Sequence, residues 1–189
     1  MFVLAFAITL LVGLTFWLPT KSHQGELRTR DGFVVTVFFW LVLSGFGSLP
    51  LMLSEATNLT FIDALFESVS GLTTTGATVL SGLDDLPKSI LYYRQQLQWL
   101  GGIGIVVIAV AILPMLGIGG MQIYRAETPG PVKDSKLTPR IAETANVLFK
   151  IYLTLKADCT LAYYVSVMSG FEAIVYSFSI DAIGGFYSH

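Results

Sequence analysis

The stretch Ser68–Leu83, SVSGLTTTGATVLSGL, places three threonines and a glycine between two long apolar runs of the chain. The 189 residues are 53% hydrophobic and only 13% charged, a composition that does not suit the surface of a water-soluble domain. We therefore predict an all-α integral membrane protein. In such a protein, a polar stretch between apolar runs needs a physical reason.

Four apolar runs are long enough to cross a bilayer, whose core of about 30 Å takes about 20 helical residues. They are Met1–Leu18, Phe33–Leu53, Leu97–Gly117 and Thr144–Met168. The first lacks the charged start and the small-residue cleavage site of a signal peptide, so we interpret it as a membrane helix. Two shorter apolar pieces cannot cross and are predicted to be re-entrant helices, Thr60–Ser70 and Ser169–Ser179.

The distribution of charge predicts which side of the membrane each loop faces. Loops 19–32 and 118–143 carry most of the basic residues, so we expect both in the cytoplasm. Segment 54–90 has Lys88 as its single basic residue and five acidic ones, and is expected outside. Both short helices would then enter the membrane from the outer face.

The second cytoplasmic loop is broken by turn-forming residues, Pro129, Gly130, Pro131 and Pro139. We interpret it as a connector between two membrane units. The predicted organisation is an N-terminal membrane helix and loop (1–32), a first helix, re-entrant loop and helix unit (33–117), a cytoplasmic connector (118–143), and the start of a second unit (144–189).

The two short helices belong to an internal repeat. Aligning Thr60 with Ser169 needs no gap, and the same offset aligns Gly76 with Gly185. The pairs Thr60/Asp63 and Ser169/Glu172 both have the spacing of a capping box, in which a hydroxyl and an acid satisfy the first N–H groups of a helix. Each unit is therefore predicted to contain a spanning helix, an acid-capped short helix and a descent of small residues.

A short helix that stops inside the membrane directs its carbonyl end, which carries about half a negative charge, toward the interior. Irregular backbone survives at that depth only when it is buried in protein or lines a water-filled cavity. Carbonyl rings replace the hydration shell of a potassium-sized ion, and glycine permits the backbone twist that such a ring needs. The alternative is a tight buried turn between two helices, but a chance turn has no reason to recur in the same setting.

From about Phe33 to Ala145 the residues, above all SVSGLTTTGATVLSGLDDLPKSILYYRQQLQWLGGIGIVV, closely resemble the membrane subunit of the bacterial Trk potassium-uptake system. That subunit belongs to the superfamily that includes the Ktr and HKT proteins. The resemblance implies repeated helix, pore-loop and helix units of potassium-channel type, four to a chain, around one selectivity filter. It also implies a homodimer, multi-pass in the bacterial inner membrane, with a cytosolic nucleotide-binding ring as its regulator.

Carried over by motif, the resemblance assigns potassium-binding backbone carbonyls to two short segments, with potassium as the transported ion and no organic cofactor. They are Thr73, Thr74, Thr75 and Gly76 in the first unit, and Ala182, Ile183, Gly184 and Gly185 in the second.

The chain departs from the family pattern in three places. It stops at His189, just past the second segment, so we expect it to be an N-terminal fragment of such a transporter. Lys156 and Asp158 fall inside a predicted span, where we favour a local loss of sequence constraint over a charge relay. Asp181, which aligns with Leu72, would add a negative charge beside the ion path, and Tyr187 stands where a small residue is expected.

Other features have simpler interpretations. The stretch GGIG at 101–104 is interpreted as a site of close helix packing. Arg94 is expected to extend to the outer interface, in preference to the alternative that it holds a pore-loop carbonyl. No catalytic arrangement, metal cluster or nucleic-acid patch is apparent in the sequence, so an enzyme is not expected. The expected function is potassium uptake, with two alternatives: a subunit of a separate-chain cation channel, or a membrane interaction protein that transports nothing.

Overall fold

A computed structural model describes residues 1–21, 29–112, 137–166 and 168–186 of the chain. Over these ranges the chain contains helices and no strand, as the sequence predicts. The predicted connector lies mostly outside the described residues, as do positions 113–117 and Tyr187.

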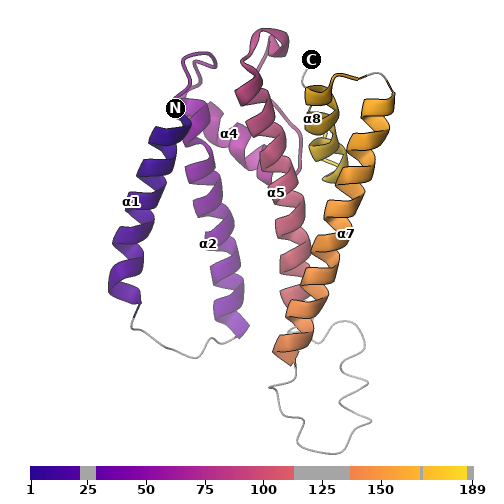
Figure 1. The fold of residues 1–189 in the computed structure, drawn as a ribbon. Helices are drawn as coiled ribbons and strands as arrows, with labels where there is room; N and C mark the ends of the chain where they lie inside the picture. Colours follow the sequence, from indigo (N-terminus) through magenta and orange to yellow (C-terminus); the bar gives the residue numbers. More distant parts are fainter. Residues whose placement is uncertain (22–28, 113–136, 167, 187–189) are drawn as a thin grey trace, which may run out of the picture.

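Four long helices run side by side (Figure 1): α1 (Phe2–Thr20), α2 (Thr29–Gly47), α5 (Lys88–Ile112) and α7 (Leu137–Val165). Among the described residues, α1 and the stretch Val34–Met52 are long and apolar enough to cross a membrane. A single turn of 3₁₀ helix, η1 (Leu83–Asp85), precedes α5.

Prolines explain two differences from the predicted boundaries. The second apolar run is not one helix, because α3 (Leu49–Met52) begins anew after α2. Pro50 has no N–H and fits the first turn of a helix, where no partner is needed. α7 begins at Leu137 rather than at the predicted Thr144, with Pro139 in its first turn, where its missing N–H needs no partner.

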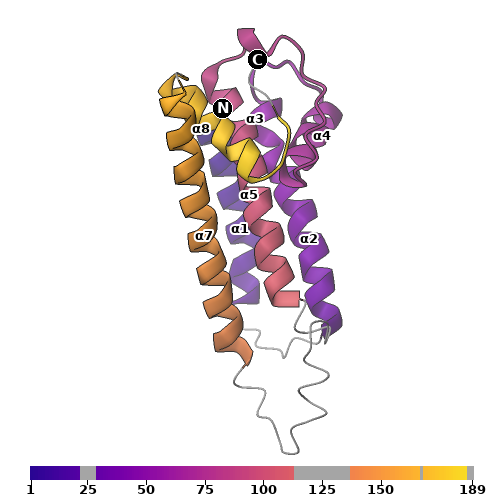
Figure 2. The ribbon, with the colours of Figure 1, turned by 90° about the vertical axis from the view of Figure 1, so that its right-hand side faces the viewer.

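Two short helices, α4 (Phe61–Leu72) and α8 (Gly170–Asp181), lie where re-entrant helices were predicted. Figures 1 and 2 place both at the same end of the long helices. α4 packs against α2 and α5, and α8 packs against α5 and α7, so that α5 contacts both.

The last residues of the two short helices meet the middle of α5. Gly101 lies against the backbone of Leu72, where a side chain would collide with the Leu72 carbonyl oxygen, and Gly102 lies against the side chain of Ala182. The prediction that this glycine-rich stretch serves close helix packing is therefore confirmed. α4 and α8 both stop part of the way along α5, as re-entrant helices do.

The two helix starts differ in their caps. In α8, Ser169 Oγ accepts from the Glu172 N–H at 3.3 Å while Glu172 Oε2 accepts from the Ser169 N–H at 3.1 Å, a complete capping box. In α4, Thr60 Oγ1 accepts from the Asp63 N–H at 3.3 Å, but the Asp63 carboxylate accepts from the Thr60 hydroxyl at 2.6 Å instead of from the backbone. The prediction of a capping box was wrong here, because aspartate is one methylene shorter than the glutamate that the motif requires.

The polarity of this fold is inverted relative to a soluble protein. Large apolar side chains of α1 and α2 are exposed, including Val3 at 83% and Phe16 at 71%. The fully buried side chains instead include Glu67, Arg94, Gln95 and Gln98. Buried polar groups inside an apolar exterior are typical of membrane proteins, where they mark functional sites.

Candidate functional site

The two predicted filter segments have the same backbone conformation. We call Thr73–Gly76 segment 1 and Ala182–Gly185 segment 2. The backbone angle φ is 55° at Thr74 and 54° at its counterpart Ile183, and it is 75° at Gly76 and 74° at Gly185. Positive φ is rare for residues other than glycine, so its recurrence at the predicted offset shows that the two segments share one fold.

The hydrogen bonds at the ends of α4 and α8 repeat at the same offset. The Thr75 N–H donates to the Ser70 carbonyl at 2.9 Å, and the Gly184 N–H donates to the Ser179 carbonyl at 2.8 Å. These bonds turn each chain back from its helix end in the same way, although the side chains of the two segments differ almost throughout.

The structure brings the two segments together. A Cβ built on Gly76 would collide with the carbonyl oxygen of Gly184 and lie 3.2 Å from the carbonyl carbon of Gly185. Gly76 therefore has to be glycine for two reasons: its φ is left-handed, and the neighbouring backbone leaves no room for a side chain. Gly185 has the same φ, but a Cβ there meets nothing within 4 Å among the described residues.

Segment 1 is supported by a buried ion pair. Glu67, on α4, has its Oε2 3.2 Å from Arg94 Nε on α5, and the two side chains are 0% and 1% exposed. Glu67 Oε1 accepts from the N–H groups of Val79, at 2.7 Å, and Leu80, at 3.2 Å, and also from the Thr78 hydroxyl. The chain that follows segment 1 is thus fastened to α4 and α5.

Besides Glu67 and Thr78, Arg94 contacts Phe186, the residue that follows segment 2. Its Cζ lies 4.3 Å from the ring centroid of Phe186, which is buried. The expectation that Arg94 extends to the outer interface was wrong, because a carboxylate and an aromatic face compensate its charge in the interior.

Segment 2 is supported by two buried glutamines of α5. Gln98 Nε2 donates to the Gly184 carbonyl at 2.6 Å, and the Phe186 N–H donates to Gln98 Oε1 at 3.4 Å. Gln95 Nε2 donates to the Phe186 carbonyl at 2.8 Å. A helix of the first unit therefore holds the backbone of the second.

The unusual charges of the second unit lie beside α8. Lys156 Nζ is 3.6 Å from the ring centroid of Phe178 and 4.7 Å from that of Trp99, and it interacts electrostatically with Asp181. Asp181 Oδ2 is buried and has no hydrogen-bond partner among the described residues. Lys156 thus contacts two aromatic rings and faces an acid, whereas Asp158 on the same helix is exposed.

The sequence analysis did not identify the supporting residues Glu67, Gln95 and Gln98. A signal was present, because polar residues inside membrane segments are functional by default. Glu67 interrupts the apolar run of α4, and the sequence RQQLQ at 94–98 overlaps the start of the span predicted from Leu97.

Comparison with known proteins identifies a family over the whole chain. The family described as TrkH, a cation transport protein, matches residues 1–189. The Trk system potassium uptake protein TrkH of Halomonas elongata is 62% identical over 188 residues, covering 100% of this chain and 39% of that protein. TrkH of Escherichia coli is 56% identical and TrkG of the same organism 48%, with the same coverage.

A solved structure is also similar. The crystal structure of the potassium transporter TrkH from Vibrio parahaemolyticus matches with a TM-score of 0.85 and 52% sequence identity, covering 100% of this chain and 37% of that one. The chain thus spans about two fifths of the length of the relatives it matches. With its spanning helices and paired pore loops, this integral membrane protein belongs to the TrkH family of cation transport proteins.

Proposed function

We propose that the complete gene product takes up potassium through a selectivity filter lined by backbone carbonyls, with segments 1 and 2 as two of its walls. The observation that carries this proposal is the repeated left-handed backbone of two segments that lie against each other at the ends of two short helices. A pair of unrelated turns would have no reason to share these angles or to meet.

The physical basis is the charge that the backbone presents. α4 and α8 both end beside the middle of α5, so the negative ends of two helix dipoles lie in the same region. The carbonyls of Thr73–Gly76 and Ala182–Gly185 follow directly and are the proposed ligands of a dehydrated potassium ion. Several weak sites in series replace hydration without holding the ion too tightly to leave.

We further propose the wider assembly that the family resemblance implies. The gene product would form a homodimer, multi-pass in the bacterial inner membrane, whose pores each use four helix, pore-loop and helix units. A cytosolic nucleotide-binding ring would regulate it, and uptake would be passive or coupled to a second ion. The names of the relatives as parts of a Trk potassium uptake system support this proposal.

The experiment is rubidium uptake into liposomes that contain the complete gene product, with potassium and sodium as competitors. Gly76→Ser is the test variant, because it places a side chain against the Gly184 carbonyl. Gly82→Ser is the matched control: Gly82 also has a positive φ, 65°, but lies outside both segments, and the nearest atom to its Cβ is 3.9 Å away. Both variants place a serine at a backbone position with positive φ, but only Gly76→Ser lies in a predicted filter segment.

We expect potassium to compete far better than sodium in the wild type and in Gly82→Ser, and to lose that advantage in Gly76→Ser. Selective flux that ignores Gly76→Ser would exclude segment 1 from the filter. An absence of flux from folded wild-type protein would favour the membrane interaction protein. Selective flux that requires a second, separately encoded chain would favour the separate-chain channel.

A further inference from the structure

The backbone angle φ does not explain why residue 184 is a glycine. Unlike Gly76 and Gly185, it is not among the residues with positive φ, and its counterpart in segment 1 is Thr75. A Cβ at Gly184 would lie 2.5 Å from Cδ and 2.6 Å from Nε2 of Gln98. The missing side chain is therefore what lets the Gln98 amide reach the backbone of segment 2.

The Gln98 amide engages the two peptide units on either side of Gly185. It donates to the carbonyl of Gly184 and accepts from the N–H of Phe186. In a trans peptide the carbonyl lies opposite the N–H. Because the Phe186 N–H is directed at Gln98, the Gly185 carbonyl in the same peptide unit is directed away from Gln98 and from α5.

Gln95 fastens the next peptide unit, through the Phe186 carbonyl. Both glutamine side chains are almost completely buried, so water does not compete for these bonds. A glutamine is suited to this position because one amide supplies both a donor and an acceptor to irregular backbone, which has no neighbour in a helix or sheet to satisfy it.

We infer that Gln98 is a positioning residue for ion selectivity: it anchors the Gly184 carbonyl and thereby directs the Gly185 carbonyl toward the ion. This inference rests on the proposed function and deepens it, because it divides the predicted ligands of segment 2 into an anchor, Gly184, and a ligand, Gly185. The first unit would then set the geometry of the ion sites in the second.

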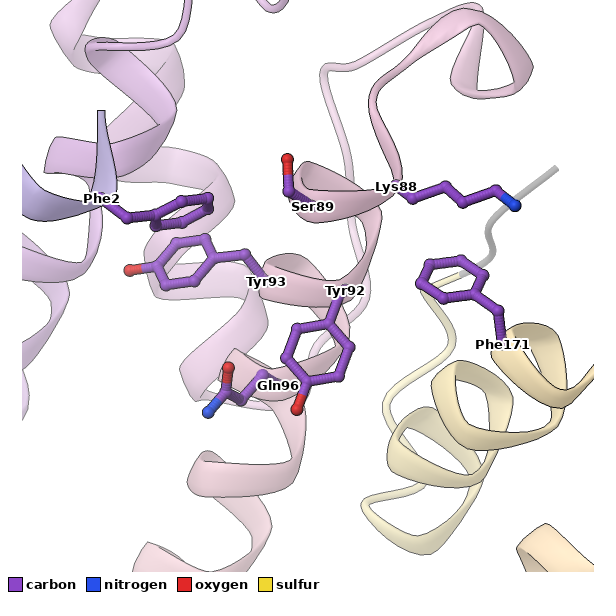
Figure 3. Close-up of a pocket in the computed structure, with 7 residues that line it drawn as sticks. All are labelled: Phe2, Lys88, Ser89, Tyr92, Tyr93, Gln96 and Phe171. Atoms are coloured by element: carbon purple, nitrogen blue, oxygen red, sulfur yellow. The ribbon is translucent and has the colours of Figure 1, made fainter.

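The chain supplies a matched control on the same helix. Gln96 lies between the two anchoring glutamines but lines a pocket of about 510 Å³ together with Phe2, Tyr92 and Tyr93 (Figure 3). Among the described residues, it makes no hydrogen bond to either segment. Gln96→Met and Gln98→Met are therefore the same chemical change at a neutral and an anchoring position.

The test compares potassium with sodium as competitors of rubidium uptake by the complete gene product, in the wild type, Gln98→Met, Gln95→Met, Gln96→Met and Gly76→Ser. The readout is the inhibition constant of sodium divided by that of potassium. This ratio does not depend on how much protein inserts into the liposomes. We expect Gln98→Met to lower this ratio by about threefold to tenfold, which is the change in affinity that corresponds to the loss of one hydrogen bond. Gln95→Met should lower it less, and Gln96→Met should leave it unchanged.

A wild-type ratio in folded Gln98→Met, beside a loss in Gly76→Ser, would overturn the inference and leave the proposed function standing. No preference for potassium in the wild type would overturn both. If Gln98→Met does not fold, as judged by its elution as a single species in detergent, Gln95→Met decides: a lowered ratio supports the inference and an unchanged ratio overturns it.

Discussion

Segment 1 is held from within its own unit, whereas segment 2 is held largely from the unit before it. Glu67 and Arg94 fasten the chain after segment 1 to α4 and α5. Gln95 and Gln98, also on α5, fasten segment 2. The backbone geometry repeats closely while its supports do not, so the geometry is the shared requirement and each unit meets it with different side chains.

The largest effect should come from removing the buried charge that serves both segments. Arg94→Met leaves the Glu67 carboxylate buried without its cation and removes the contact with Phe186. We expect a loss of about 3 to 5 kcal/mol in the free energy of unfolding, the usual consequence of stranding one partner of a buried pair. The measurement is denaturant unfolding of the purified gene product in detergent.

The control for this variant is Lys88→Met, at the exposed start of α5. The Lys88 ammonium lies 5.3 Å from the ring centroid of Phe171, so this change should lower stability by no more than about 1 kcal/mol. Adding Glu67→Gln to Arg94→Met should recover part of the loss, because the stranded group is then neutral. A loss for Arg94→Met no larger than that for Lys88→Met would show that the pair contributes nothing to the support of segment 1.

Much of this architecture follows from the sequence alone. The glycine pair Gly76 and Gly185 and the hydroxyl-plus-acid helix starts recur at a constant offset, because the backbone itself demands these residue types. Glu67 aligns with Tyr176 and therefore does not appear in the repeat. Its partner Arg94 is distant in sequence, and Gln98 meets a segment of another unit, so only the tertiary fold reveals either contact.

Helix boundaries show a second limit of sequence reasoning. Hydropathy predicts one continuous span where Pro50 starts the separate helix α3, and it predicts a helix start at Thr144 where α7 already begins at Leu137, with Pro139 in its first turn. A proline indicates that a helix is interrupted or begins. Apolarity alone does not distinguish these outcomes, because either arrangement can keep the same residues in the membrane.

A smaller effect should come from the second unit. Lys156→Met removes a cation that contacts Phe178 and Trp99 and faces Asp181. We expect a loss of about 1 to 2 kcal/mol, since a cation over aromatic rings contributes about 0.5 to 1 kcal/mol at an exposed site and about 2 kcal/mol when desolvated, and Lys156 is half-buried. The same unfolding measurement applies, with Lys150→Met, at an exposed position on α7, as the control.

Replacing Asp181 by leucine, the residue at the matching position of the first unit, should recover stability in the Lys156→Met background, since the carboxylate that lost its cation is then removed as well. A Lys156→Met variant as stable as Lys150→Met would support the interpretation that Lys156 reflects a local loss of sequence constraint. A loss as large as that of Arg94→Met would remove the distinction between a fully buried pair in one unit and a half-buried one in the other.

The smallest predicted effect separates the two helix starts. Asp63→Glu adds the methylene that the first unit lacks, so its carboxylate can reach the Thr60 N–H as Glu172 reaches that of Ser169. We expect a gain of about 0.5 kcal/mol, read as a higher midpoint of thermal unfolding, and a loss of similar size for Glu172→Asp. The gain is small because the new bond replaces the one that Asp63 now accepts from the Thr60 hydroxyl. If Asp63→Glu instead lowers the midpoint while Glu172→Asp leaves it unchanged, the shorter acid caps at least as well as the longer one at both starts, and side-chain length does not explain the difference between the two caps.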